Sequence, residues 1–135
     1  MAGKTLRATA LATGLLACAT LPVCAGVVLT QLAMLPFDGA WPFGMSSLAA
    51  GNWIYEKVTN DSFIPGATFL MDYANTGCHG DTGSAAFIEQ VNKKNYFSVG
   101  GAYCFLPTKN VALLAHPINL PFVSWGSAGP DLSDR

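Results

Sequence analysis

The sequence predicts an α/β fold built on a parallel sheet, with the element order β-α-β-α-β-α-β. Three observations predict it. Short apolar runs alternate with longer segments of helical periodicity, fourteen Gly and eight Pro provide turns between them, and only 11% of the 135 residues are charged. Alternating strands and helices are typical of βαβ units with right-handed crossovers. We therefore expect part of a doubly wound parallel sheet.

The first 25 residues are predicted to be a secretory signal that precedes this fold. Lys4 and Arg7 are followed by an apolar core over residues 8–20, which is shorter than the roughly 20 residues that span a bilayer. Small residues then surround a cleavage site after Ala25, as signal peptidase requires. The alternative is an uncleaved membrane anchor. Loss of the two basic residues with the signal changes the net charge from −1 to −3.

The first half of residues 26–135 contains two predicted strands and a helix. Val27–Leu35 is a nearly continuous apolar run, which is typical of a strand buried on both faces. Residues 43–60 have helical periodicity, with Leu48, Gly51, Ile54, Tyr55 and Val58 on one face. Trp53 lies off this face, either exposed or covering a second surface. Residues 67–73 then form the second strand.

The second half repeats the pattern. Asp81, Thr82 or Ser84 is expected to cap a helix that ends near Lys94. A short strand over 96–99, a Gly-containing turn, a helix from about Pro107 and a strand over 120–125 follow. Ligands in such folds bind outside the carboxyl ends of the strands. The candidate binding surface therefore comprises the loops 36–41, 75–80, 100–104 and 126–129.

Two cysteines remain after removal of the signal, Cys78 and Cys104. An exported chain meets an oxidising compartment, in which two thiols usually pair, so we predict a Cys78–Cys104 disulfide. The alternatives are a free thiol pair or a metal site. No metal is expected, because only His79 lies near and the sequence has no CxxC motif.

Catalytic motifs are absent from the sequence. It contains no GxGxxG after the first strand, no Walker motif and no GxSxG elbow. The histidines His79 and His116 and the carboxylates Asp72 and Asp81 form no evident acid–base pair. The low basic charge excludes a nucleic-acid binder that depends on charge. The chain is therefore not expected to be an enzyme.

Two further sites are predicted from local pattern. Asn60-Asp61-Ser62 matches the N-x-[ST] acceptor for N-glycosylation at Asn60. The turn that holds Gly100, Gly101, Tyr103 and Cys104 precedes a helix, and its backbone N–H groups can bind an anion or a ligand. The alternative is a simple turn whose cysteine anchors a disulfide.

An ordered set of segments resembles the ligand-binding region of receptor guanylate cyclases and natriuretic peptide receptors. The set covers nearly all of residues 26–135. The resemblance implies the type I periplasmic-binding-protein fold, of which this chain would supply the first half of the membrane-distal lobe. The segments are 32–36 with 41–43, 54–61 with 64–68, Cys78 before a helix, 97–104, and 120–126 with 131–134.

The resemblance also implies a function. The intact protein would be a cell-surface receptor, often a homodimer, that couples binding of a peptide or small molecule to cyclic GMP synthesis. Cys78 and Cys104 match the first disulfide of the family, beside which natriuretic peptide receptors hold a chloride ion. Here Tyr103 stands where the family often has Gly, and Met71 stands where it has a serine, which disfavours chloride as a ligand.

Two alternatives remain. One is the amino-acid-binding ectodomain of a class C G-protein-coupled receptor, which shares the fold. Ser127 would then match the hydroxyl residue after the fourth strand, although the turn 100–104 lacks the serine expected there. The other is a secreted soluble binding protein or a truncated product without function.

Overall fold

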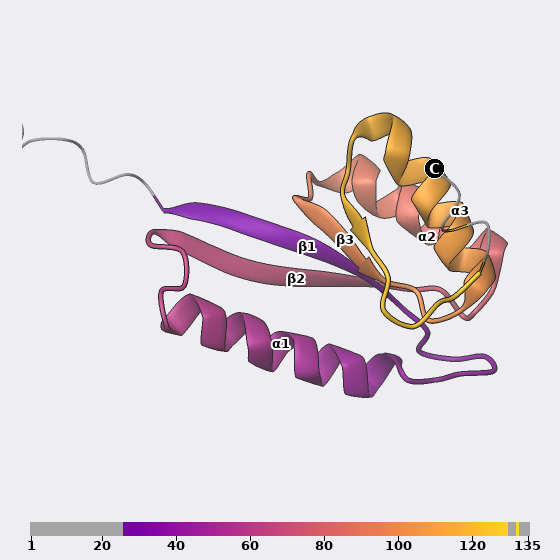
Figure 1. Ribbon diagram of the computed structural model, residues 1–135, viewed down its shortest axis with the longest axis horizontal. Helices are drawn as coiled ribbons and strands as arrows, with labels where there is room; N and C mark the ends of the chain where they lie inside the picture. The colour runs from indigo at the N-terminus through magenta and orange to yellow at the C-terminus, as the bar shows by residue number, and fades with distance from the viewer. Residues whose placement is uncertain (1–25, 130–131, 133–135) are drawn as a thin grey trace, which may run out of the picture.

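The structure is a computed structural model that describes residues 26–129 and Leu132, so the predicted signal over residues 1–25 lies outside the described residues. Strands and helices alternate along the chain (Figure 1). This order confirms the predicted α/β fold. The elements are β1 (Val27–Leu35), α1 (Gly44–Asn60), β2 (Ala67–Asn75), α2 (Gly80–Lys93), β3 (Ser98–Gly101), α3 (Phe105–Ala115), the 3-10 helix η2 (His116–Ile118) and β4 (Phe122–Val123).

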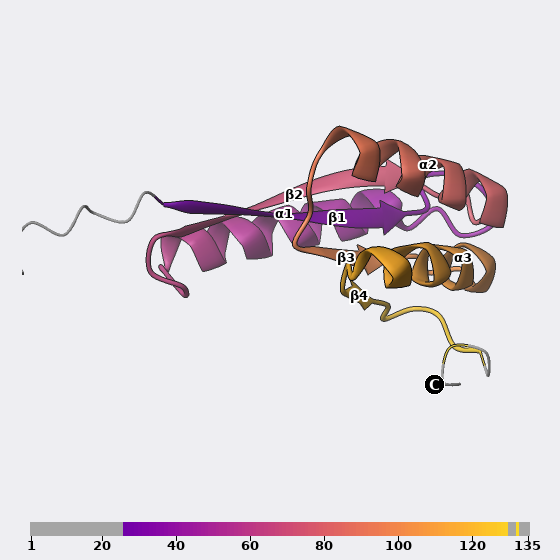
Figure 2. The ribbon, with the colours of Figure 1, turned by 90° about the horizontal axis from the view of Figure 1, so that it is seen from above.

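The four strands form one parallel sheet in the order β2-β1-β3-β4. The central strand β1 pairs with β2 over its whole length, from Val27 opposite Ala67 to Leu35 opposite Asn75. Figures 1 and 2 show α1 running along β2, with α2 and α3 lying together beside β3. Because side chains alternate along a strand, β1 presents one set of residues to α1 and the other set to α2 and α3.

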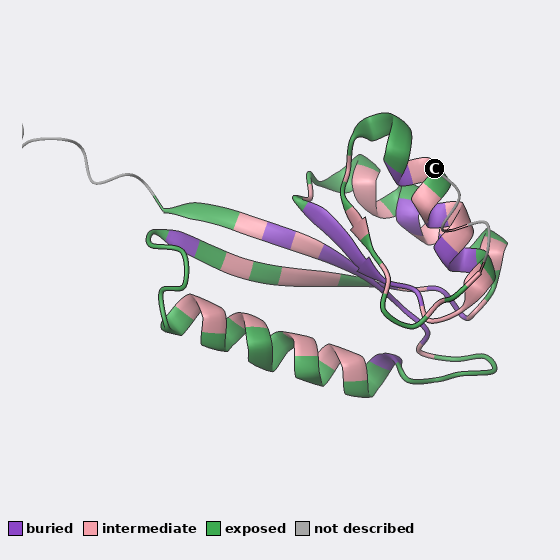
Figure 3. Cartoon of the chain, viewed as in Figure 1, coloured by how far each residue is buried: buried purple, intermediate pink, exposed green. Residues whose placement is uncertain are grey.

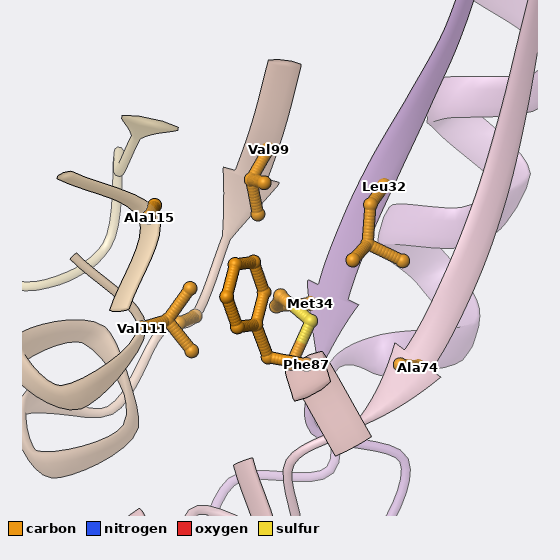
Figure 4. Packing of buried hydrophobic residues seen from close by; sticks show 8 residues of the cluster. Leu32, Met34, Ala74, Phe87, Val99, Val111 and Ala115 are labelled. Atoms are coloured by element: carbon orange, nitrogen blue, oxygen red, sulfur yellow. The ribbon is translucent and has the colours of Figure 1, made fainter. Parts of the chain in front are cut away.

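The hydrophobic core lies between the sheet and the pair α2 and α3. Figure 4 shows the Phe87 ring of α2 among side chains from β1, β3 and α3. Buried segments accordingly concentrate on β1, β3 and α3 in Figure 3. The buried members of this cluster are Leu32, Met34, Ala74, Phe87, Val99, Ala102, Val111 and Ala115.

Helix α1 covers the opposite face less completely. Gly44 is its one buried residue, and Ile54, predicted to be buried, is exposed. Trp53 is 61% exposed, which settles the alternatives left open by the sequence in favour of exposure. Beneath the helix, the Tyr55 hydroxyl donates to Gln31 Oε1, and Gln31 Nε2 donates to Ser98 Oγ over 3.0 Å. Partial burial raises the pKa of Tyr55.

Several predicted boundaries are wrong in detail. Gly100 and Gly101 belong to β3, opposite Ala33 and Met34, and are not part of a turn. Gly101 has φ +104°, and a Cβ there would lie 2.5 Å from Met34 O, so this close strand approach requires glycine. The last strand is reduced to two residues, because only Phe122 and Val123 pair with β3.

Helix α2 also begins earlier than expected. Its N-cap is His79, which makes no side-chain capping bond, instead of Asp81, Thr82 or Ser84. The Gly83 N–H donates to the His79 carbonyl over 2.9 Å, which closes the first turn upstream of the predicted caps.

Candidate functional site

A crevice of about 770 Å³ opens at the carboxyl ends of the strands. Each of the four predicted strand-end loops contributes to its wall, and the first turns of α1 and α3 complete it. The four loops named from the sequence therefore meet at one crevice. The lining residues are Ala40, Trp41, Phe43, Ser46, Ser47, Cys78, Tyr103, Cys104, Phe105, Leu106 and Gly126.

Tyr103 connects the sides of the crevice. Its hydroxyl oxygen lies 2.7 Å from Ser47 Oγ of α1. Its ring lies 6.3 Å from Phe43 and meets Trp125 edge-on at 6.2 Å, measured between ring centroids. Phe43 continues the row to Trp41 at 6.1 Å. Trp41, Phe43 and Tyr103 thus form a row of aromatic side chains along the crevice, and Trp125 packs against Tyr103 without lining the crevice.

Gly126 makes room for this arrangement. A Cβ at Gly126 would lie 2.5 Å from Tyr103 Cδ1, well inside van der Waals contact. The loop after β4 can therefore approach the Tyr103 ring only because residue 126 has no side chain.

The disulfide forms another part of the wall. The structure joins Cys78, in the loop after β2, to Cys104, the N-cap of α3, with Cα atoms 5.3 Å apart. Both cysteines line the crevice. The bond therefore holds together two of the loops that a ligand would contact.

Asn75 fixes the loops on the other side. Its Oδ1 accepts hydrogen bonds from the backbone N–H groups of Phe37 and Gly77, each over 3.0 Å. Its Nδ2 donates to Asp38 Oδ2 over the same distance. One side chain at the end of β2 thus ties the loop after β1 to the loop after β2.

The crevice lining carries no charged side chain. Its polar side-chain groups are the hydroxyls of Ser46, Ser47 and Tyr103 and the indole N–H of Trp41. The Ser46 and Ser47 hydroxyls both donate to Phe43 O over 3.0 Å. Since a hydroxyl has one proton, Ser47 Oγ accepts from the Tyr103 hydroxyl in the arrangement in which Ser47 donates to Phe43 O. In this arrangement the oxygens of Ser46, Ser47 and Tyr103 keep lone pairs that can accept hydrogen bonds.

Only two of the four residues predicted for an anion-binding turn belong to this site. Tyr103 and Cys104 line the crevice, whereas Gly100 and Gly101 do not. The intervening N–H of Ala102 donates to Met34 O over 2.6 Å, so it is not directed at a ligand.

The other predicted residues lie away from the crevice lining. Met71 packs against Gly51 of α1 and lines a separate cavity of about 250 Å³. Ser127 follows the lining residue Gly126, but its hydroxyl is buried without a hydrogen-bond partner. Asn60 is the last residue of α1, at the opposite end of that helix from the lining residues Ser46 and Ser47.

The sequence reasoning missed several lining residues, all of which lie around the starts of α1 and α3. The signal that could have found them is simple, because in a parallel sheet the helix after each strand begins at the carboxyl edge. Extending each predicted loop by about two helical turns would have included them. They are Phe43, Ser46, Ser47, Phe105 and Leu106.

Within the described residues there is no cluster of three or more His, Cys, Asp or Glu side chains suited to a metal ion. The same part of the chain contains no helix long and apolar enough to cross a bilayer.

A search of curated proteins finds a relative among the receptor cyclases. The chain is 30% identical over 101 residues to receptor-type guanylate cyclase gcy-19 of Caenorhabditis briggsae. The match includes 75% of this chain and 8% of the relative, so the chain spans only a small part of that protein's length. No family model matches the chain.

Solved structures reveal the fold. Leucine-binding protein LivK from Thermotoga maritima matches 79% of this chain with a TM-score of 0.69 and 16% identity, over 30% of its own length. The chain has the type I periplasmic-binding-protein fold. The isoleucine complex of LivJ from Streptococcus pneumoniae has the same fold, with a TM-score of 0.65, 11% identity, and 72% and 28% of the two chains covered.

A third protein of this fold was solved with a different ligand. The solute-binding protein of an ABC transporter from Rhodopseudomonas palustris, in complex with 3,4-dihydroxybenzoic acid, has a TM-score of 0.62 and 13% identity, over 72% and 26% of the two chains. The type I periplasmic-binding-protein fold thus accommodates unlike ligands, and the lining residues of each protein set the specificity.

The relative and the fold together confirm the resemblance that the sequence motifs indicate. They support a ligand-binding ectodomain, and the matched fold is that of a binding domain instead of a catalytic domain.

Proposed function

We propose that this chain forms part of the first lobe of a receptor ectodomain and that it binds its ligand in the crevice at the carboxyl ends of the strands. The observation that carries the proposal is the convergence of four strand-end loops on one aromatic-lined crevice. The guanylate cyclase relative supports the receptor assignment. In the intact protein, ligand binding outside the cell would control cyclic GMP synthesis by other domains, in an assembly that we expect to be a homodimer.

The lining indicates the chemistry of the ligand. Trp41, Phe43 and Phe105 offer apolar rings, and the hydroxyl oxygens beside them are acceptors. A ligand that fits is therefore an uncharged apolar molecule, or an apolar side chain of a peptide, that carries an N–H or O–H donor. A free amino acid would bury a carboxylate and an ammonium group without a charged partner in this lobe, which is unfavourable.

The class C receptor alternative has less support. It assigns the amino group of the ligand to Ser127, and Ser127 is not among the lining residues. We therefore favour the receptor cyclase assignment.

A thermal-shift screen tests the binding site. Aromatic compounds that are uncharged, anionic or cationic are added to the folded chain, and we expect uncharged donors to raise the unfolding midpoint most. Trp41→Ala should abolish the shift. Trp53→Ala is the matched control, because both indoles are exposed to a similar extent, 59% and 61%, and only Trp41 lines the crevice. Equal shifts in the two variants would refute the site.

Transcript sequencing on both sides of the region encoding residues 1–135 tests the receptor assignment. A reading frame that also encodes a membrane span and a cyclase domain is expected. A frame encoding seven membrane spans would favour the G-protein-coupled alternative, and a frame confined to these residues would favour a secreted binding protein.

A further inference from the structure

The carboxyl end of α1 carries features that neither the core nor the crevice uses. Asn60 is the last residue of the helix and is exposed to solvent. It begins Asn60-Asp61-Ser62, which is the only N-x-[ST] acceptor in the sequence. The loop that follows lies beside the start of β1, where the Val27 N–H donates to Gly66 O. Figure 1 shows the carboxyl end of α1, where Asn60 is the last residue, at the amino ends of β1 and β2. The crevice lies at the other end of the sheet, where Ser46 and Ser47 of the first turn of α1 line it.

A shallow groove of about 370 Å³ runs along α1 from this residue. It is lined by Trp53, Glu56, Lys57, Asn60 and Asp61. Trp53 precedes Asn60 by about two turns of helix, or roughly 10 Å along the axis. Because helical side chains lean toward the amino terminus, the Asn60 side chain leans along the groove toward Trp53. An exposed tryptophan therefore lies in the direction in which a group attached to Asn60 would extend.

The groove has the chemistry that a sugar needs. The face of an indole ring carries partial negative charge, which attracts the C–H face of a pyranose ring, and contact between the two removes apolar surface from water. Charged groups of Glu56, Lys57 and Asp61 lie in the same groove and can bind sugar hydroxyls. Lys57 and Asp61 are held in position by an ion pair of 3.0 Å, with both side chains more than half exposed.

We propose that Asn60 carries an N-linked glycan whose first sugars lie in this groove against Trp53. In the modification, the Asn60 amide nitrogen bonds to the anomeric carbon of a lipid-diphosphate-linked oligosaccharide. The bond from that carbon to the diphosphate breaks, the lipid diphosphate leaves, and the amide nitrogen loses one proton. The glycan would cover Trp53 and leave the ligand crevice free.

The modification is tested by translating the full chain in the presence of endoplasmic-reticulum vesicles. We expect a protease-protected product whose extra mass is removed by an N-glycan amidase. Asn60→Gln and Ser62→Ala should both lose that mass. Asn52→Gln is the matched control, because Asn52 is an exposed asparagine of the same helix outside any acceptor motif, and this variant should keep it. A product without the extra mass, or one that never enters the vesicles, would overturn the proposal.

The contact between the glycan and Trp53 is tested by a double-mutant cycle, in which the thermal unfolding midpoint of the purified glycoprotein is measured. The wild-type chain should unfold a few degrees higher than Asn60→Gln. In a Trp53→Ala background the glycan should still be attached, but this difference should disappear. An equal difference in both backgrounds would show that the sugars do not lie on Trp53, even if Asn60 is modified.

Discussion

The two faces of the sheet are built differently. Between the sheet and α2 and α3, Leu32, Met34, Phe87, Val99 and Val111 are almost fully buried. On the opposite face α1 lies against β2 and β1. Val123 of β4 and Trp125 in the loop after β4 are more than half exposed. Most of the stabilising core is thus separate from the crevice, although the Cys78–Cys104 disulfide belongs to the crevice lining as well. One face supplies most of the buried apolar surface, and the other remains accessible at the edge where the crevice opens.

The largest effect on stability is expected on the face of the sheet that α2 and α3 cover. Phe87→Ala should lower the free energy of unfolding by about 3–5 kcal/mol, because it removes a fully buried ring and leaves a cavity. Denaturant unfolding measures it. Ile88→Ala is the control, since Ile88 is the neighbouring residue and is 45% exposed. Similar losses in both variants would contradict the assignment of the core to this face.

The disulfide should have the next largest effect. Replacing both Cys78 and Cys104 by serine should cost about 3 kcal/mol, because the bond closes a loop with a sequence separation of 26 residues. The same change should weaken ligand binding, since both residues line the crevice. Mass spectrometry of the secreted chain should find the linked peptides, whereas two alkylatable thiols in the native protein would refute the bond.

A smaller effect on stability is expected at the crevice. Tyr103→Phe keeps the ring contacts and removes the hydroxyl bond to Ser47, so the free energy of unfolding should fall by only about 1 kcal/mol. Ligand affinity should fall as well, because one of three acceptor oxygens in the crevice is lost. Ile88→Ala, on α2 and outside the crevice lining, should leave affinity unchanged. Unaltered affinity in Tyr103→Phe would count against a polar contact there.

The last expected effect concerns the pH dependence of stability and involves Tyr96, which packs against the core. Burial, followed by the hydrogen bond to Asp72, raises the pKa of Tyr96 to about 12. A raised pKa means that folding favours the protonated hydroxyl. This contribution is complete below about pH 10, the usual pKa of tyrosine, and is lost as pH rises toward 12.

Unfolding measured between pH 9 and 12 should therefore show a steeper loss of stability in the wild-type chain than in Tyr96→Phe. Tyr73→Phe is the control, because Tyr73 is an exposed tyrosine of β2 and should retain the wild-type slope. Identical slopes in all three proteins would contradict the role of Tyr96.

Much of this fold was predictable, because buried parallel strands have a strong sequence pattern. Val27–Leu35 and the start of β2 at Ala67 were predicted correctly, since apolar runs bounded by turns determine them. The end of β3 was not predicted. Gly100 and Gly101 are typical of a turn, and their place in the strand depends on the close approach of Met34 on β1, which local sequence does not contain.

The site was predicted at the level of loops and not of side chains. The rule for parallel sheets locates the crevice edge, but it does not specify which residues meet there. The sequence predicts a role for the backbone N–H groups of the turn that holds Tyr103. In the structure the Tyr103 side chain joins α1 to the loop after β4. The hydrogen bond between Ser47 and Tyr103 depends on tertiary packing between residues 56 positions apart, and the ring contact of Tyr103 with Trp125 also joins separate loops.

The most direct test is an NMR titration of the isotopically labelled chain with benzyl alcohol, benzoate and benzylammonium. The account predicts that benzyl alcohol, an uncharged ring with one O–H donor, shifts amide signals around Trp41, Tyr103 and Leu106 more than either charged analogue does. Shifts confined to α2 and α3, or strongest for a charged analogue, would contradict the claim that this uncharged crevice is the ligand-binding site.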